Sequence, residues 1–185
     1  MVGFIILGVV VVLLAVFLIG IYNSLVQLRQ RVQNAWSQVD VQLKRRYDLI
    51  PNLVNAVKGY AQHEKATFES VTQARNMAMN AGNLQEQMQA ENMISNALRS
   101  LFAVAEAYPE LKANTNFLQL QSELTDTEGK IAYARQFYND TVQKFNTKVE
   151  LFPNNLVAGM LGFAMVDYFT LQGEPDARQA VNVEF

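Results

Sequence analysis

The chain has 185 residues, a formal net charge of -2 at pH 7, one histidine and no cysteine. This length is sufficient for one membrane segment and one domain with a single core, so a second soluble domain is not expected. The absence of cysteine excludes disulfides, thiolate metal sites and cysteine nucleophiles. The small negative charge also argues against nucleic acid as a partner.

Residues 2–22 form an uninterrupted run without a charged side chain. A helix needs about 20 apolar residues to cross about 30 Å of hydrocarbon, and this run supplies them. A cleaved signal peptide has a basic segment before its apolar core, whereas no Lys or Arg precedes this run. We therefore expect residues 1–22 to be a retained transmembrane anchor, with Tyr22 at the membrane interface.

Apolar residues then recur with a period of eleven, at Leu25, Leu28, Val32, Trp36, Val39, Leu43, Tyr47, Ile50 and Val54. Eleven residues in three turns keep one face of a helix apolar. The repeat continues the phase of the apolar run, so the anchor and the first bundle helix are predicted to form one helix. Pro51 does not shift the pattern, which runs on to Asn80. We expect either a kink at residues 47–50 or a break with Pro51 opening a new helix.

Two further helices are predicted. Asn83, followed three residues later by Glu86, has the spacing of a capping box and begins the second helix; Pro109 ends it or starts the next. The third carries a coiled-coil-like seam with an apolar or aromatic residue every seven positions: Phe117, Leu124, Ile131, Tyr138, Phe145 and Phe152. No alternating run typical of a strand appears before Val181. The prediction is an all-α fold: an anchor at 1–22 that continues into an elongated antiparallel bundle of long helices at 23–169.

Several segments resemble the LemA family in sequence and in order. The most specific is Arg-Arg-Tyr-Asp-Leu-Ile-Pro-Asn-Leu-Val at 45–54; the others lie at 22–23, 34–36, 67–69, 74–76, 107–114, 131–139, 152–156 and 158–160. The resemblance implies an N-terminal anchor, a bundle of long helices and a bacterial membrane protein connected with envelope maintenance. It ends near Phe169, and 170–185 is expected to be a variable tail.

The residues offer no catalytic, cofactor or metal constellation. His63 is preceded at three residues by Tyr60 rather than Glu, so the paired Glu-x-x-His motif of di-iron bundles cannot form. The serines lie on predicted helices rather than on a nucleophile turn, and Gly129-Lys130 lacks the first glycine of a phosphate loop. An oxygen-only cation site remains a minor alternative to solvated helix faces for Glu64, Glu69, Glu106, Glu110 and Glu128. We predict that the protein is not an enzyme.

Two sets of residues are candidates for function. Polar side chains in a packed setting form either a structural network of paired charges or a surface for partners: Arg45, Arg46, Asp48, Asn52, Glu128, Arg135 and Asn139. The first part of the eleven-residue stripe is the candidate assembly face of a homo-oligomer: Leu25, Leu28, Val32, Trp36, Val39 and Leu43. The hypothesis is a membrane-anchored, non-enzymatic scaffold or adaptor that contacts lipid, self-assembles and engages other membrane proteins. The alternative is a ligand-sensing helical module at the membrane.

Residues 156–166 are apolar but too few to span a bilayer. We expect a short helix, capped by Asn154 or Asn155, that docks on the bundle, with contact to the membrane surface as the alternative. If it docks closely, a charge at Gly159 or Gly162 should disrupt folding.

Basic residues suggest the orientation in the membrane. Arg29 and Arg31 lie within ten residues of the end of the apolar run, and Lys44, Arg45 and Arg46 follow. The positive-inside rule therefore predicts an inner (plasma) membrane protein with one span, its bundle in the cytoplasm and its N-terminus outside. Only Arg29 and Arg31 fall within the window of about 20 residues where the rule is reliable, so a periplasmic bundle is the alternative.

Overall fold

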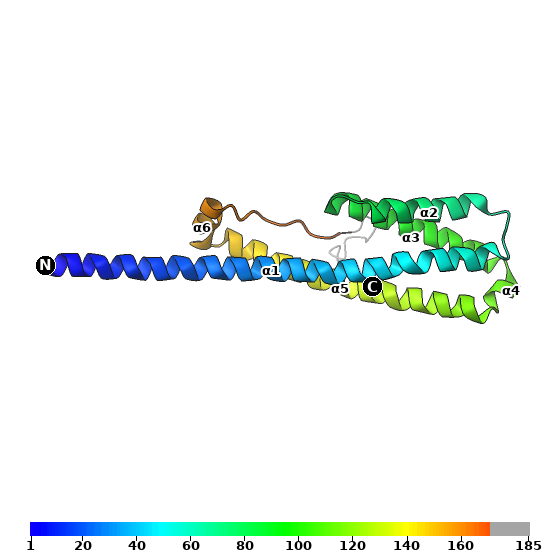
Figure 1. Ribbon diagram of the computed structural model, residues 1–185, viewed down its shortest axis with the longest axis horizontal. Helices are drawn as coiled ribbons and strands as arrows, with labels where there is room; N and C mark the ends of the chain where they lie inside the picture. The colour runs from blue at the N-terminus through cyan, green and yellow to red at the C-terminus, as the bar shows by residue number, and fades with distance from the viewer. Residues whose placement is uncertain (171–185) are drawn as a thin grey trace, which may run out of the picture. The chain divides into compact units, whose positions relative to one another are not determined.

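The computed structural model describes residues 1–170, which form six helices and no strand (Figure 1). This confirms the predicted all-α fold. Residues 171–185, which hold all but the first residue of the expected tail, lie outside the described part of the chain.

The first helix, α1, extends from Val2 to Lys58 without interruption. The apolar run and the first bundle helix are therefore one helix, as their common phase predicts. Pro51 lies inside α1, so the expected alternative of a break at this residue is wrong.

The chain leaves helix after Lys58, whereas the apolar pattern predicted helix as far as Asn80. After a turn, α2 occupies Lys65–Met79 and α3 occupies Leu84–Glu106, and the two helices pack side by side (Figure 1). Asn83 caps α3 as predicted, because its side chain accepts a hydrogen bond from the backbone N–H of Glu86 at 2.9 Å. The Glu86 carboxylate in turn accepts a hydrogen bond from the backbone N–H of Gly82 at 2.8 Å.

Pro109 begins the four-residue helix α4, Pro109–Lys112, and is followed by α5, Thr115–Glu150. The predicted seam of α5 is buried at Phe117, Leu124, Ile131, Tyr138 and Phe145. Its expected last member is not part of the seam: Phe152 follows the end of α5 and is 78% exposed.

The short predicted helix is α6, Asn154–Leu161, which ends at Gly162 in the left-handed conformation, φ 72°. The expected asparagine cap is wrong. Pro153 is the N-cap residue, no side chain caps the helix, and Asn154 is its first residue.

The chain divides into two compact units. Unit 1 comprises Met1–Gln42 and Lys130–Tyr168, and unit 2 comprises Leu43–Gly129 together with Phe169 and Thr170. Both α1 and α5 contribute residues to each unit. The core of unit 1 includes Leu25, Val39 and Phe145, and that of unit 2 includes Ile50, Ile94 and Leu101.

Candidate functional site

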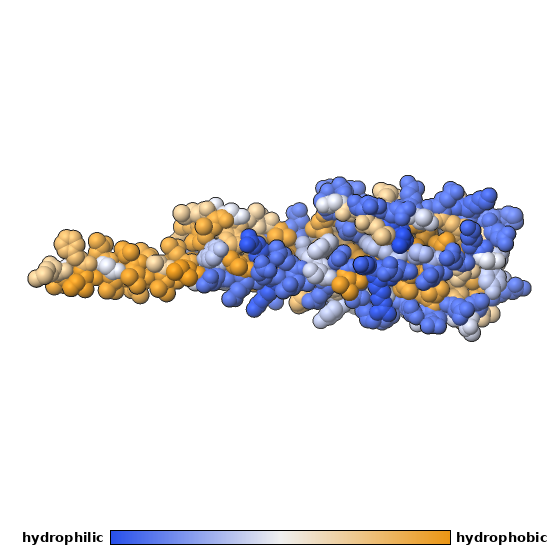
Figure 2. Space-filling model, in the orientation of Figure 1, coloured by the Kyte–Doolittle hydropathy of each residue, from blue (hydrophilic) through white to orange (hydrophobic). Residues whose placement is uncertain are grey.

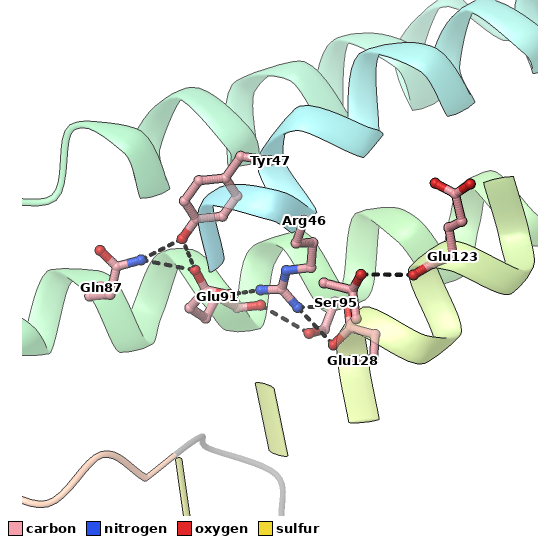
Figure 3. A network of polar contacts seen from close by, with 8 residues as sticks. Arg46, Tyr47, Gln87, Glu91, Ser95, Glu123 and Glu128 are labelled. Atoms are coloured by element: carbon pink, nitrogen blue, oxygen red, sulfur yellow. Dashed lines mark hydrogen bonds and ion pairs between the residues drawn. The ribbon is translucent and has the colours of Figure 1, made fainter. Parts of the chain in front are cut away.

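Unit 2 contains an arginine buried between two carboxylates. Arg46 of α1 is 2% exposed, and its Nη1 donates hydrogen bonds to both carboxylate oxygens of Glu128 on α5, at 2.8 and 3.0 Å. Its Nη2 forms an ion pair with Glu91 of α3, which is equally buried (Figure 3). One guanidinium thus connects three helices.

Glu91 has two neutral partners as well. The hydroxyl of Tyr47 donates to Oε1 of Glu91, and the side-chain amide of Gln87 donates to the same oxygen at 2.8 Å and to the Tyr47 hydroxyl oxygen at 2.6 Å (Figure 3). A buried carboxylate without such partners would be strongly destabilising. The contacts instead form a connected network that fixes how α1, α3 and α5 align.

A second polar contact compensates for Pro51. Proline lacks the N–H that would bond the carbonyl of Tyr47, four residues earlier. Arg75 of α2 donates its Nε–H to this carbonyl at 2.7 Å. The Arg75 side chain therefore replaces the missing backbone donor, which explains how α1 continues through Pro51.

The same part of unit 2 has an open groove of about 980 Å³ between the end of α1 and α2. Its apolar lining comes from both helices and consists of Ile50, Pro51, Val54, Phe68 and Met77. Its polar and charged lining consists of Asn55, Lys58, Glu69, Thr72, Gln73, Arg75, Asn76 and Asn80. A groove with such a mixed lining has the character of a site for a helix or for a small amphipathic molecule.

Among the predicted polar residues, the described part of the chain shows Arg46 and Glu128 in contact. Arg46 and Glu128 form an ion pair, whereas Arg45, Asp48 and Asn52 are exposed on α1. Two more belong to unit 1, where both are half-buried: Arg135 and Asn139. Four further residues complete the site, and their polar roles are not predicted from the sequence: Tyr47, Arg75, Gln87 and Glu91.

The expected assembly face is largely covered by the chain itself. Four of its six residues are buried, namely Leu25, Val32, Val39 and Leu43. The other two, Leu28 and Trp36, are half-buried. Within unit 1, the ring of Trp36 packs edge-on against Tyr138 of α5, with centroids 5.4 Å apart. Any homo-oligomer therefore needs another surface.

The hydroxyl of Tyr138 in unit 1 has a raised pKa. Burial raises this pKa above 10.0, and the negative charge of Asp167 adds to the effect. The hydroxyl donates to the backbone carbonyl of Asp167 at 3.0 Å. Tyr138 therefore stays neutral at physiological pH and fixes the segment that follows α6 to α5.

Among residues 1–170, no group of three or more His, Asp or Glu side chains is placed to hold a metal ion. The glutamates considered as an oxygen-only site do not form such a group.

The N-terminal part of α1 has the length and composition of a membrane span, and α1 is the one helix with this property in the described part of the chain. Its large apolar side chains between Val2 and Ile19 are 46 to 83% exposed. This agrees with association with a membrane.

Comparison with known proteins gives consistent matches. A sequence model of the LemA family matches residues 35–185. Magnetosome proteins MamQ 1 and MamQ 2 of Paramagnetospirillum magneticum are each 26% identical over 174 residues, covering 80% of this chain and 64% of theirs. Protein LemA of Metamycoplasma hominis is 28% identical over 152 residues, covering 82% of this chain and 69% of its own. The chain thus matches less than two thirds of the length of the MamQ relatives.

Proposed function

Because the chain belongs to the LemA family, we propose that it is a membrane-anchored, non-enzymatic adaptor that binds a helix of another membrane protein in the groove between α1 and α2. The anchor is the apolar N-terminal part of α1, and the membrane is the inner membrane of a bacterium. The magnetosome name of the MamQ relatives supports a membrane setting, and a role in envelope maintenance fits such an adaptor.

The groove is the observation that carries this proposal. Its apolar floor includes Ile50 and Phe68, and its charged lining includes Lys58 and Glu69. An amphipathic helix buries its apolar face in such a groove and leaves its polar face to the rim. Arg46 and Arg75 hold α1 in place beside the groove, so the surface is preformed, which lowers the entropic cost of binding.

Photocrosslinking in membranes tests the proposal. A benzophenone amino acid replaces Met77, which lines the groove. In the control it replaces Met93 on α3, which does not line the groove but is similarly exposed, at 40% compared with 45% for Met77. We expect a membrane protein to crosslink at position 77 and not at position 93. Adducts of the same proteins at both positions would contradict the proposal.

A groove-filling variant adds a second criterion. Thr72 is exposed and lines the groove, so Thr72→Trp narrows it without replacing a buried residue. The crosslink at position 77 should disappear in this variant while the helical content stays unchanged. Persistence of the adduct would mean that the partner binds elsewhere.

The second candidate is a ligand-sensing module. A volume of about 980 Å³ lies at the upper end of small-molecule pockets, which occupy about 300–1,000 Å³. Native mass spectrometry of the protein purified from its host membrane distinguishes this candidate. If the protein is a ligand-sensing module, the spectrum should show a bound small molecule as added mass, and this added mass should be absent in the Thr72→Trp variant.

Self-assembly remains part of the proposal, through a surface other than the buried stripe. Light scattering of the protein in mild detergent tests it. A mass corresponding to one chain would remove this part and leave the groove unaffected.

A further inference from the structure

Six large apolar side chains in and around α6 are exposed, between 53 and 86%: Leu151, Phe152, Leu156, Met160, Leu161 and Met165. We call them the α6 patch. No charged residue occurs between Leu151 and Val166. Exposed apolar side chains that are gathered in one segment without a charged residue indicate an interaction site.

The opposite face of α6 and the segment after it are fixed within unit 1. Val157 and Ala158 are buried. The side chain of Asn146 on α5 exchanges two hydrogen bonds of 2.9 Å with the backbone N–H and carbonyl of Val166. The α6 patch is therefore presented by a held segment.

Phe163 shows where along α1 this segment lies. Its buried ring packs edge-on against Tyr22, with centroids 6.1 Å apart, and the guanidinium of Arg29 lies 5.1 Å from its centre. Tyr22 closes the charge-free run, and Arg29 is the first charged residue after it. Seven residues of helix measure about 10 Å. The segment thus lies at the level where a span meets water, the depth that aromatic and basic side chains favour.

The exposed surfaces also join. Figure 2 shows hydrophobic surface extending from the N-terminal part of α1 onto α6, and both belong to unit 1. A lipid bilayer around the span would meet this surface without any further partner.

We propose that the α6 patch inserts into the headgroup and acyl-chain boundary of the same bilayer that α1 spans, as a second membrane contact. Apolar faces bind at this boundary by entering it to about 5–10 Å. The occupant is lipid, and the inference rests on the proposed anchoring by α1. Two contacts with one membrane fix the tilt and rotation of unit 1 relative to the bilayer.

Depth-dependent fluorescence quenching tests the proposal on the full-length chain. Because the sequence has no cysteine, a single introduced cysteine carries an environment-sensitive NBD dye. The positions are Met160→Cys in the α6 patch, Leu13→Cys in the span and Tyr133→Cys on α5, which is 73% exposed. Phosphatidylcholine vesicles contain lipid with a nitroxide either near the headgroup or in the middle of the acyl chain.

We expect dye at position 160 to show a blue-shifted emission and stronger quenching by the shallow nitroxide than by the deep one. Dye at position 13 should be quenched more by the deep nitroxide. Dye at position 133 should be quenched by neither nitroxide, because this position lies far from the bilayer. Tyr138, five residues further along α5, contacts Trp36 of α1, and Trp36 lies about 20 Å along α1 from Tyr22 at the membrane interface.

The outcomes separate this inference from the anchoring. Quenching at position 13 without quenching at position 160 would overturn the second contact and leave the anchor. Absence of quenching at both positions would overturn both. A blue shift at position 160 that grows with the protein-to-lipid ratio but shows no quenching would assign the patch to a second copy of the chain, against our proposal.

Discussion

Glu91 occupies a position in α3 where the helical period requires an apolar side chain. Leu84, Ile94, Leu98 and Leu101 belong to the same stripe, and Glu91 falls between them, 1% exposed. Its charge is compatible with the core because Arg46, Tyr47 and Gln87 all contact it. Glu128 differs, since its side chain is 41% exposed and therefore partly solvated.

We predict that Glu91→Gln destabilises the protein strongly and that Glu128→Gln does so weakly. Removal of one partner of a buried ion pair costs up to about 3–5 kcal/mol; Arg46 keeps Glu128 as a partner in Glu91→Gln, so we expect the lower part of this range. Glu128→Gln should cost less, because the Glu128 side chain is 41% exposed and partly solvated, and because Arg46 keeps its buried partner Glu91. Thermal unfolding of both variants in the same detergent, followed by circular dichroism at 222 nm, measures the difference.

The double variant Arg46→Met, Glu91→Leu is the matched control. Replacement of a buried ion pair by apolar residues is often neutral or stabilising, so this variant should unfold at a higher temperature than Glu91→Gln. Equal effects of Glu91→Gln and Glu128→Gln would show that the buried network contributes less than its geometry indicates.

The contact between Arg75 and the Tyr47 carbonyl leads to a second prediction. Arg75→Met removes this donor from the carbonyl, and the loss of a hydrogen-bond partner from a buried polar group costs about 1–3 kcal/mol. In a Pro51→Ala background the same substitution should cost less, because the introduced alanine supplies the backbone N–H that proline lacks. A double-mutant cycle from unfolding midpoints gives the coupling; equal losses in both backgrounds would rule out the compensation.

Part of this site is predictable from sequence. Arg46 and Glu128 attract attention because each is a charge beside an apolar stripe. Glu91 has the same signal, since it interrupts the stripe of α3 in phase, yet the sequence does not show which cation it meets. Tyr47 and Arg75 are harder to identify, because their roles depend on α2 and α3 packing against α1.

At the scale of the elements, helix boundaries are predictable from sequence where they depend on contacts between residues close together in the chain. Asn83 and Glu86 predict the start of α3 because the capping contacts are local. The turn between Lys58 and Lys65 escapes prediction because α2 continues the apolar phase of α1. The period of the apolar residues shows which face of a helix is buried, but it does not show whether the chain reverses direction. Gly59 is the one residue at this turn that locally favours a helix end.

The two glycines of the α6 region should respond differently to substitution. Gly162 has a φ of 72°, and a left-handed residue other than glycine costs roughly 1–2 kcal/mol. Gly159 has open space where a Cβ would lie, and alanine is favoured over glycine inside a helix by about 0.5–1 kcal/mol. We therefore expect Gly162→Ala to lower the unfolding temperature and Gly159→Ala to leave it unchanged or raise it.

The expectation that a charge at Gly159 or Gly162 disrupts folding if α6 docks closely stays a prediction, and the structure distinguishes the two positions. Gly159 lies on the exposed face of α6, so a charge there changes the surface and not the packing. A lower unfolding temperature of Gly159→Ala, measured beside Gly162→Ala, would show that this face is covered.

At the scale of the whole molecule, the same apolar stripe admits two interpretations that sequence cannot separate. Leu25, Val32 and Val39 can be buried by a second copy or by a later part of the same chain, and both satisfy the pattern. In the structure their own chain covers them. The all-α fold and the single apolar span are predictable because they depend on composition and period alone.

Orientation in the membrane is a property of the whole chain and has a direct test. Residues 23–46 contain five basic side chains and one acidic residue: Arg29, Arg31, Lys44, Arg45 and Arg46; Asp40. Basic segments next to a span are retained in the cytoplasm. Of these basic residues, Arg29 and Arg31 lie within the window of about 20 residues from the span where the rule is reliable, so they should dominate the orientation.

We predict that a fluorescent protein fused after Phe185 is bright and that alkaline phosphatase fused at the same site is inactive, because the phosphatase matures only outside the cytoplasm. Replacement of Arg29 and Arg31 by glutamine, together with three lysines added before the span, should invert both signals if charge sets the orientation. An active phosphatase with a dark fluorophore in the unmodified chain would place unit 2 on the periplasmic side. The partner of the groove would then have to be sought there.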